Sequence, residues 1–119
     1  MRIRLTNGDQ SATVTLLDNA TARDFASLLP FTLTMHDLFG REKAGPLPRA
    51  LASDGEPQST YRVGDVGYWS PSNDLAIYYD DDGETIPSPG IIMIGTVDSG
   101  LDVIASVDDS FQLTIDAVA

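Results

Sequence analysis

Short runs of alternating polar and apolar residues, each closed by a turn signal, constrain this chain more than any other feature. The first run covers residues 2–5 and is followed by Asn7 and Gly8, a dipeptide typical of tight hairpin turns. The alternation resumes over 12–17, with β-branched residues. Because successive side chains of a strand point to opposite faces of a sheet, both runs predict strands with one buried face. The sequence therefore predicts an N-terminal β-hairpin.

Helical spacing is confined to two short segments. A first helix is expected between Thr21 and Pro30, where apolar residues recur three and four positions apart after candidate N-cap residues. A second short helix is expected over 99–105. Residues 40–57 are rich in glycine and proline and are expected to be irregular. The remaining strands are expected at 31–36, 61–69, 75–79, 91–97 and 111–115.

The expected elements, seven strands and two short helices, favour a single mainly-β domain over residues 1–119. Several glycines fall inside expected strands, which is typical of bends at barrel corners. A doubly wound sheet would need more helices. A closed or nearly closed barrel plugged by the helices is therefore the predicted architecture.

Composition excludes several classes of site and partner. The chain of 119 residues has no cysteine and one histidine, so neither disulfides nor the usual zinc sites are predicted, and we expect no metal site and no cofactor. A net charge of −11 repels phosphate and anionic lipid, so neither nucleic acid nor a membrane is an expected partner. The longest apolar runs have strand length, and no signal-peptide pattern precedes the first turn. We therefore expect a cytoplasmic protein, with no prediction of its oligomeric state.

Several blocks of the sequence resemble a known family. Residues 29–35, 64–69 and 75–79 are similar to recurring blocks of the short prokaryotic proteins called cyclophilin-like. Residues 94–104 resemble the passage from strand through turn to second helix in cyclophilins. The resemblance covers nearly the whole chain and implies a cyclophilin-like closed β-barrel with two short helices. That family has no firmly assigned biochemistry, and a fold does not fix a function.

Cyclophilins are peptidyl-prolyl isomerases, and the resemblance raises the question of that activity here. Their catalysis uses an arginine within a strand, among Phe, Met, Gln, Trp and His side chains on an exterior groove. The corresponding stretch of this chain should lie between Phe31 and Leu51, and it lacks that block. Its only arginines, Arg41 and Arg49, stand beside turn residues, so we expect neither to be held in place. No catalytic residue is assigned, and isomerase activity is expected to be absent or weak.

Candidate binding residues come from three observations. The only histidine, His36, alternates away from Leu33 and Met35, and is either a polar surface residue or part of a functional groove. Alternation sends two of the aromatic residues in 68–79 inward and two outward, for core packing or for the rim of a small apolar pocket. The acidic run 80–84 does not fit the calcium-loop pattern and is expected to be a solvated turn. The candidate ligand-binding residues are His36, Arg41, Tyr68, Trp69 and Tyr78.

These observations favour a module that binds a small ligand or peptide and lacks strong catalysis. Two alternatives stay open. A diverged prolyl isomerase would place Arg41 or Arg49 within reach of an apolar pocket. An accessory protein-interaction domain would have a featureless exterior groove.

Overall fold

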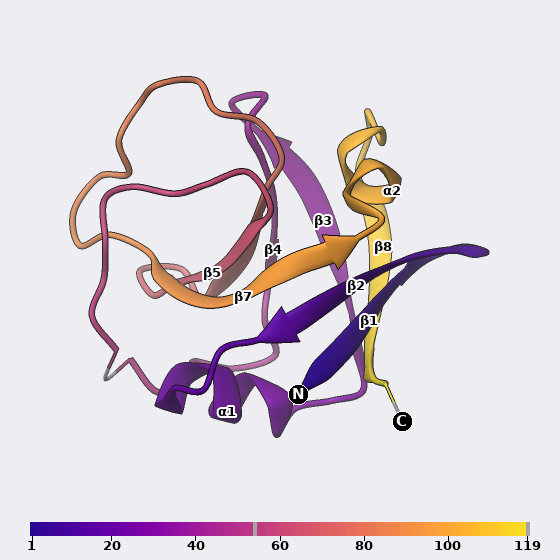
Figure 1. The fold of residues 1–119 in the computed structure, drawn as a ribbon, viewed down its shortest axis with the longest axis horizontal. Coiled ribbons are helices and arrows are strands. Elements are labelled where there is room, and N and C mark those ends of the chain that lie inside the picture. The colour runs from indigo at the N-terminus through magenta and orange to yellow at the C-terminus, as the bar shows by residue number, and fades with distance from the viewer. Residues whose placement is uncertain (54, 119) are drawn as a thin grey trace.

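The computed structural model describes residues 1–53 and 55–118, and within them eight antiparallel strands close into a barrel (Figure 1). The order around the barrel is β1-β2-β7-β5-β6-β4-β3-β8. The prediction of a mainly-β closed barrel with two short helices is confirmed. The elements are β1 (Arg2–Asn7), β2 (Gln10–Leu16), α1 (Ala20–Ala26), β3 (Phe31–Leu38), β4 (Glu42–Pro46), β5 (Asp65–Trp69), β6 (Asp74–Tyr78), β7 (Ile92–Ser99), α2 (Leu101–Ala105) and β8 (Phe111–Ala117).

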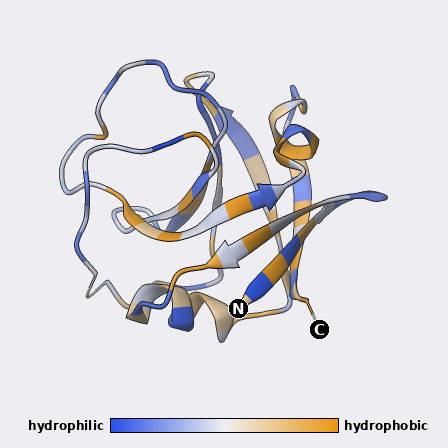
Figure 2. Ribbon diagram, viewed as in Figure 1, coloured by the Kyte–Doolittle hydropathy of each residue, from blue (hydrophilic) through white to orange (hydrophobic). Residues whose placement is uncertain are grey.

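The predicted N-terminal hairpin forms, with its turn displaced by one residue. Asn7 pairs with Gln10, so the two turn residues are Gly8 and Asp9 rather than Asn7 and Gly8. Gly8 has a φ of 66°, a conformation that costs glycine no steric strain, which is why the turn settles on it. Hydrophilic and hydrophobic residues alternate along β1 (Figure 2), and the hydrophobic set faces the barrel interior.

The two helices lie at opposite ends of the barrel (Figure 1). Helix α1 begins after Asn19, whose side-chain oxygen accepts a 2.8 Å hydrogen bond from the Ala22 amide. It buries Phe25, and α2 buries Ile104, in the interior of the barrel. Both are shorter than their sequence patterns predict. Neither helix in the described chain is long and apolar enough to cross a membrane.

Strand β4 is the main departure from the sequence prediction, because it lies within the stretch expected to be irregular. It pairs with β3 on one side and β6 on the other. Its glycine and proline have weak strand preferences, so its neighbours rather than its own sequence stabilise it. Gly45 is required there, since a β-carbon at that position would lie 2.5 Å from the Thr34 carbonyl oxygen. Conversely, only the end of the run expected at 61–69 is a strand, β5.

Apolar residues gather in two separate clusters, one on each face of the sheet. The larger fills the barrel. The smaller lies on the outer face of β5 and β6 and consists of Ala76, Tyr78, Ile86 and Ile91, with Tyr61, Trp69 and Met93 packed against it. Two long connections, residues 55–64 and residues 79–91, extend beside each other past β5 (Figure 1), joined by backbone hydrogen bonds between Gln58 and Ile91. They cover a sheet face that would otherwise meet solvent.

Candidate functional site

A cavity of about 270 Å³ lies within the outer cluster, between strands β4, β5 and β6 and the connection 79–91. It exists because two register partners on neighbouring strands, Ala44 and Ala76, are small. The larger Trp69 and Tyr78 flank them on the same face. The other lining residues are Leu38, Phe39, Arg41, Glu42, Asp74, Ile86, Pro87 and Ile91.

Strand alternation decides which of the aromatic residues reach this cavity. Trp69 and Tyr78 point to the outer face and line it. Tyr68 points into the barrel instead, where its hydroxyl donates to Asn73 Oδ1 at 2.7 Å and accepts from the Leu51 amide at 3.1 Å. Tyr79 lies beyond the end of β6, and its hydroxyl donates to Asp37. Of the candidate aromatic residues, the structure thus brings Trp69 and Tyr78 together and leaves Tyr68 in the core.

Arg41 is buried at the cavity, with only 7% of its surface exposed. Its Nε lies 3.5 Å from Glu42 Oε1, and its Nη1 lies 3.8 Å from Asp82 Oδ1. The central guanidinium carbon stands 5.3 Å from the centre of the Phe39 ring. The expectation that this arginine is loosely placed beside a turn does not hold, because packing and ion pairs fix it. The cause is the unforeseen strand β4, which begins at the next residue.

Glu42 and Tyr78 place two further polar groups at the cavity. Burial raises the pKa of Glu42 above its usual range, and this outweighs the opposing attraction of Arg41 and the hydrogen bond with Tyr78. Burial, followed by the charge of Glu42, raises the pKa of the Tyr78 hydroxyl. Tyr78 also stacks on Tyr61, with ring centres 4.2 Å apart. The polar chemistry of the cavity is therefore a compensated guanidinium, a carboxyl group and a phenol in largely apolar walls.

Phe39 and Glu42 are site residues that the sequence analysis missed. Phe39 has a φ of 59°, which is unusual for a bulky residue, and is 78% exposed at the turn between β3 and β4. The position of Phe39 directly before Gly40 was the sequence signal that could have predicted an exposed aromatic residue in a turn. His36 lies on the outer, exposed face of β3, as its alternation predicted. It pairs with Ala44 through the backbone but does not line the cavity.

A second polar cluster closes the barrel end near α2. Lys43, the only lysine, is buried and its ammonium group lies 3.3 Å from Asp37 Oδ1. It also donates to the Val107 carbonyl and stands 5.2 Å from the centre of the Tyr79 ring. The hydrogen bond from Tyr79 is the main cause that lowers the pKa of Asp37, while burial raises the pKa of Tyr79 to about 12. Its groups are all engaged with one another, so this cluster ties strands together.

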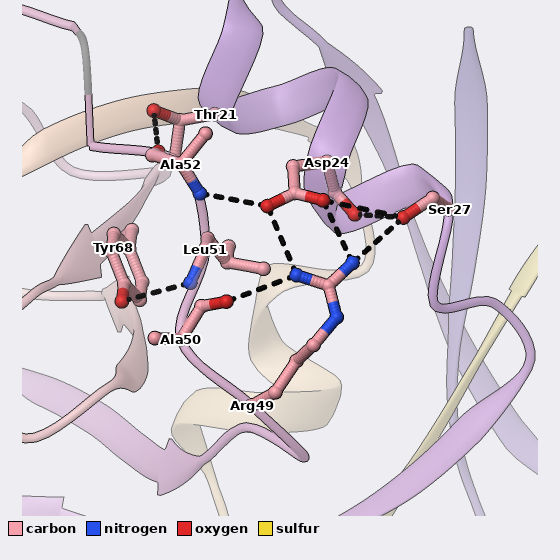
Figure 3. Close-up of polar contacts among 8 residues, drawn as sticks. All are labelled: Thr21, Asp24, Ser27, Arg49, Ala50, Leu51, Ala52 and Tyr68. Carbon is pink, nitrogen blue, oxygen red and sulfur yellow. Dashed lines mark hydrogen bonds and ion pairs between the residues drawn. The ribbon is translucent and has the colours of Figure 1, made fainter.

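A third cluster holds residues 49–52 onto α1 (Figure 3). The Asp24 carboxylate accepts hydrogen bonds from Arg49 Nη2 at 2.8 Å and from the Ala52 amide at 2.7 Å. These bonds, the one from Arg49 first, lower the pKa of Asp24 to about 2. Arg49 is therefore also held in place, contrary to expectation, but away from the cavity. Arg41 is the arginine that borders the cavity. No three His, Asp or Glu side chains in the described residues converge as a metal site.

Comparison with known proteins places this architecture in a family. No curated protein matches the chain. The solution structure of the hypothetical protein AF2241 from Archaeoglobus fulgidus is similar, with a TM-score of 0.81 and 20% sequence identity over 99% of this chain and 95% of that one. At this identity the likeness establishes the fold alone. The model of the Cyclophilin-like family matches residues 5–116. The chain therefore belongs to the Cyclophilin-like family.

Proposed function

We propose that this protein is a binding module that holds one small, mainly apolar ligand in the cavity on the outer face of β4, β5 and β6. The observation that carries the proposal is the cavity itself, with apolar walls and a few convergent polar groups, which is the usual make-up of a ligand site. Its volume of about 270 Å³ sets the size of the ligand. A cavity of about 150 Å³ holds one benzene molecule. A single ring with a short substituent, or one peptide side chain, fits this space.

The residues expected to contact the ligand are Trp69 and Tyr78 with the neighbouring Arg41. Trp69 offers a large flat apolar surface, and Tyr78 a ring with a polar tip. Glu42 and Arg41 neutralise each other's charge in part, so the cavity offers apolar contact and hydrogen bonding more than a strong field. A cavity with mainly apolar walls and partly neutralised charges suits the binding of an uncharged ligand.

A pair of cavity-filling variants tests the proposal. Fragment binding is followed by ¹H–¹⁵N NMR, using the indole signal of Trp69, the only tryptophan. We expect small apolar fragments to shift this signal in the wild type and in Ala26→Leu, a control that fills a different cavity beside α1. The same fragments should bind much more weakly to Ala76→Leu, in which the added carbons occupy part of the site. Fragment binding that is as tight in Ala76→Leu as in the wild type, or that is absent from the wild type, would contradict the proposal.

A second candidate function is weak prolyl isomerisation, and the placement of Arg41 favours it. Isomerisation must overcome a barrier of about 18–20 kcal/mol, and a cation beside an apolar pocket can stabilise the twisted amide. Arg41 borders the apolar cavity, but Glu42 and Asp82 offset its charge. We therefore expect little catalysis. A protease-free assay measures the rate of cis–trans isomerisation of a Xaa-Pro peptide by the wild type, by Arg41→Ala and by the control Arg49→Ala. Strong activity in the wild type that only Arg41→Ala abolishes would establish isomerase activity.

A further inference from the structure

The guanidinium of Arg41 has hydrogen-bonding capacity that its protein neighbours do not use. Within the described residues, its buried Nε has no hydrogen-bond partner, although the Glu42 carboxylate lies 3.5 Å away. Buried donors in folded proteins are nearly always paired, and an exception calls for an explanation. Because Arg41 also lines the cavity, a ligand with an oxygen acceptor would supply the missing partner.

The charges around Arg41 define what kind of oxygen that acceptor is. Glu42 and Asp82 already face the guanidinium, and Asp74 lines the same cavity. An ionised carboxylate on the ligand would add another negative charge among these groups. A ligand ammonium group would be attracted by these carboxylates, but it would lie beside the Arg41 cation and lose most of its water. An uncharged carbonyl oxygen avoids both penalties and still accepts the hydrogen bond.

Phe39 lies beside the Arg41 guanidinium where both border the cavity. Its ring lies against the guanidinium, yet most of the ring surface faces solvent. Little buried surface is therefore lost when the ring swings aside. A ligand that replaces the ring against Arg41 also shields the hydrogen bond from water.

We propose that the cavity takes neutral aromatic carbonyl compounds, such as aryl amides and ketones. The carbonyl oxygen accepts a hydrogen bond from Arg41, and the ring packs against Trp69. This inference rests on the proposed function, because it names the ligand class of the same cavity.

Four probes of similar size test the inference: benzamide, benzoate, benzylamine and toluene. Each is titrated into the wild-type protein while the Trp69 indole signal is followed. We expect benzamide to bind about tenfold or more tightly than each of the other three, as a buried hydrogen bond to a charged donor implies. Arg41→Lys keeps the charge but removes the Nε donor, and should abolish most of this preference. Arg49→Lys, the matched control, should leave it unchanged.

The outcomes separate the two proposals. Tighter binding of benzoate or benzylamine, or equal binding of toluene and benzamide, would overturn the ligand class and leave the binding function standing. Failure of all four probes, together with every other small fragment, would overturn the binding function itself. The ranking of the four probes on the wild type needs no variant, so it decides the ligand class even if Arg41→Lys does not fold.

Discussion

Replacing Ala76 by leucine should stabilise the fold while it narrows the cavity. The substitution adds three carbons beside empty space. Burial of that many carbons is worth up to about 2.4 kcal/mol, at about 0.8 kcal/mol each. Loss of leucine rotamer freedom removes about 0.5–1 kcal/mol, and imperfect fit removes part of the rest. We expect a net gain of about 1 kcal/mol in the free energy of unfolding.

Urea unfolding followed by far-ultraviolet circular dichroism measures this gain, because the signal does not depend on the nearby Trp69. The matched control is Ala12→Leu. Ala12 is fully buried in the barrel interior and packs so closely on Gly100 that a β-carbon built at Gly100 would lie 3.1 Å from the Ala12 β-carbon. Forcing the same carbons into a filled core should cost about 1–3 kcal/mol. If Ala76→Leu were destabilised as much as Ala12→Leu, the outer face would be tightly packed and the reasoning from the cavity would fail.

Three further predictions concern charge and backbone space. The raised pKa of Glu42 means that the folded state binds the Glu42 proton more tightly than the unfolded state does. The contribution of Glu42 to stability therefore falls as pH rises above 4.5. In denaturant titrations, Glu42→Gln should become more stable relative to the wild type over that pH range. Asp24, with a folded pKa of about 2 against an ordinary 3.8, contributes stability that is complete above pH 4 and lost towards pH 2. Asp24→Asn should flatten this acid limb in thermal melts, and an unchanged limb would show that the hydrogen bonds in Figure 3 do not persist in solution. Gly45→Ala should cost about 3 kcal/mol or more, because its β-carbon would meet the Thr34 carbonyl oxygen at 2.5 Å. Gly8→Ala, in open space at positive φ, should cost only about 1–2 kcal/mol. Equal losses in chemical denaturation would refute the close approach at Gly45.

Local patterns were sufficient to predict most of the barrel. The hairpin of β1 and β2 and the outward placement of His36 follow from period-two alternation alone. The same alternation separated Tyr68 from Trp69, although it could not say which of them faces the interior. That choice depends on how β5 pairs with β6 and β7, which are distant in sequence.

The candidate site was less predictable because it depends on a strand that local sequence does not favour. Gly45 and Pro46 indicate a break, and only pairing with β3 and β6 makes this stretch a strand. Because β4 was not predicted, nothing in the sequence indicated that Arg41 would be held in place. The cavity also requires Ala44 to lie opposite Ala76. This pairing joins two strands that are distant in sequence, so no local sequence pattern predicts it.

The separation of the two apolar clusters by the sheet bears on how such a protein can evolve. Residues that fill the barrel secure its closure, while Ile86 and Pro87 of the connection 79–91 shape the cavity. Substitutions at those two positions can change the size and chemistry of the site and leave the interior side chains untouched. Under the proposed function, ligand choice depends on residues of the outer cavity, whereas barrel closure depends on the side chains inside it. Substitutions at the cavity could then change ligand choice without compensating substitutions inside the barrel.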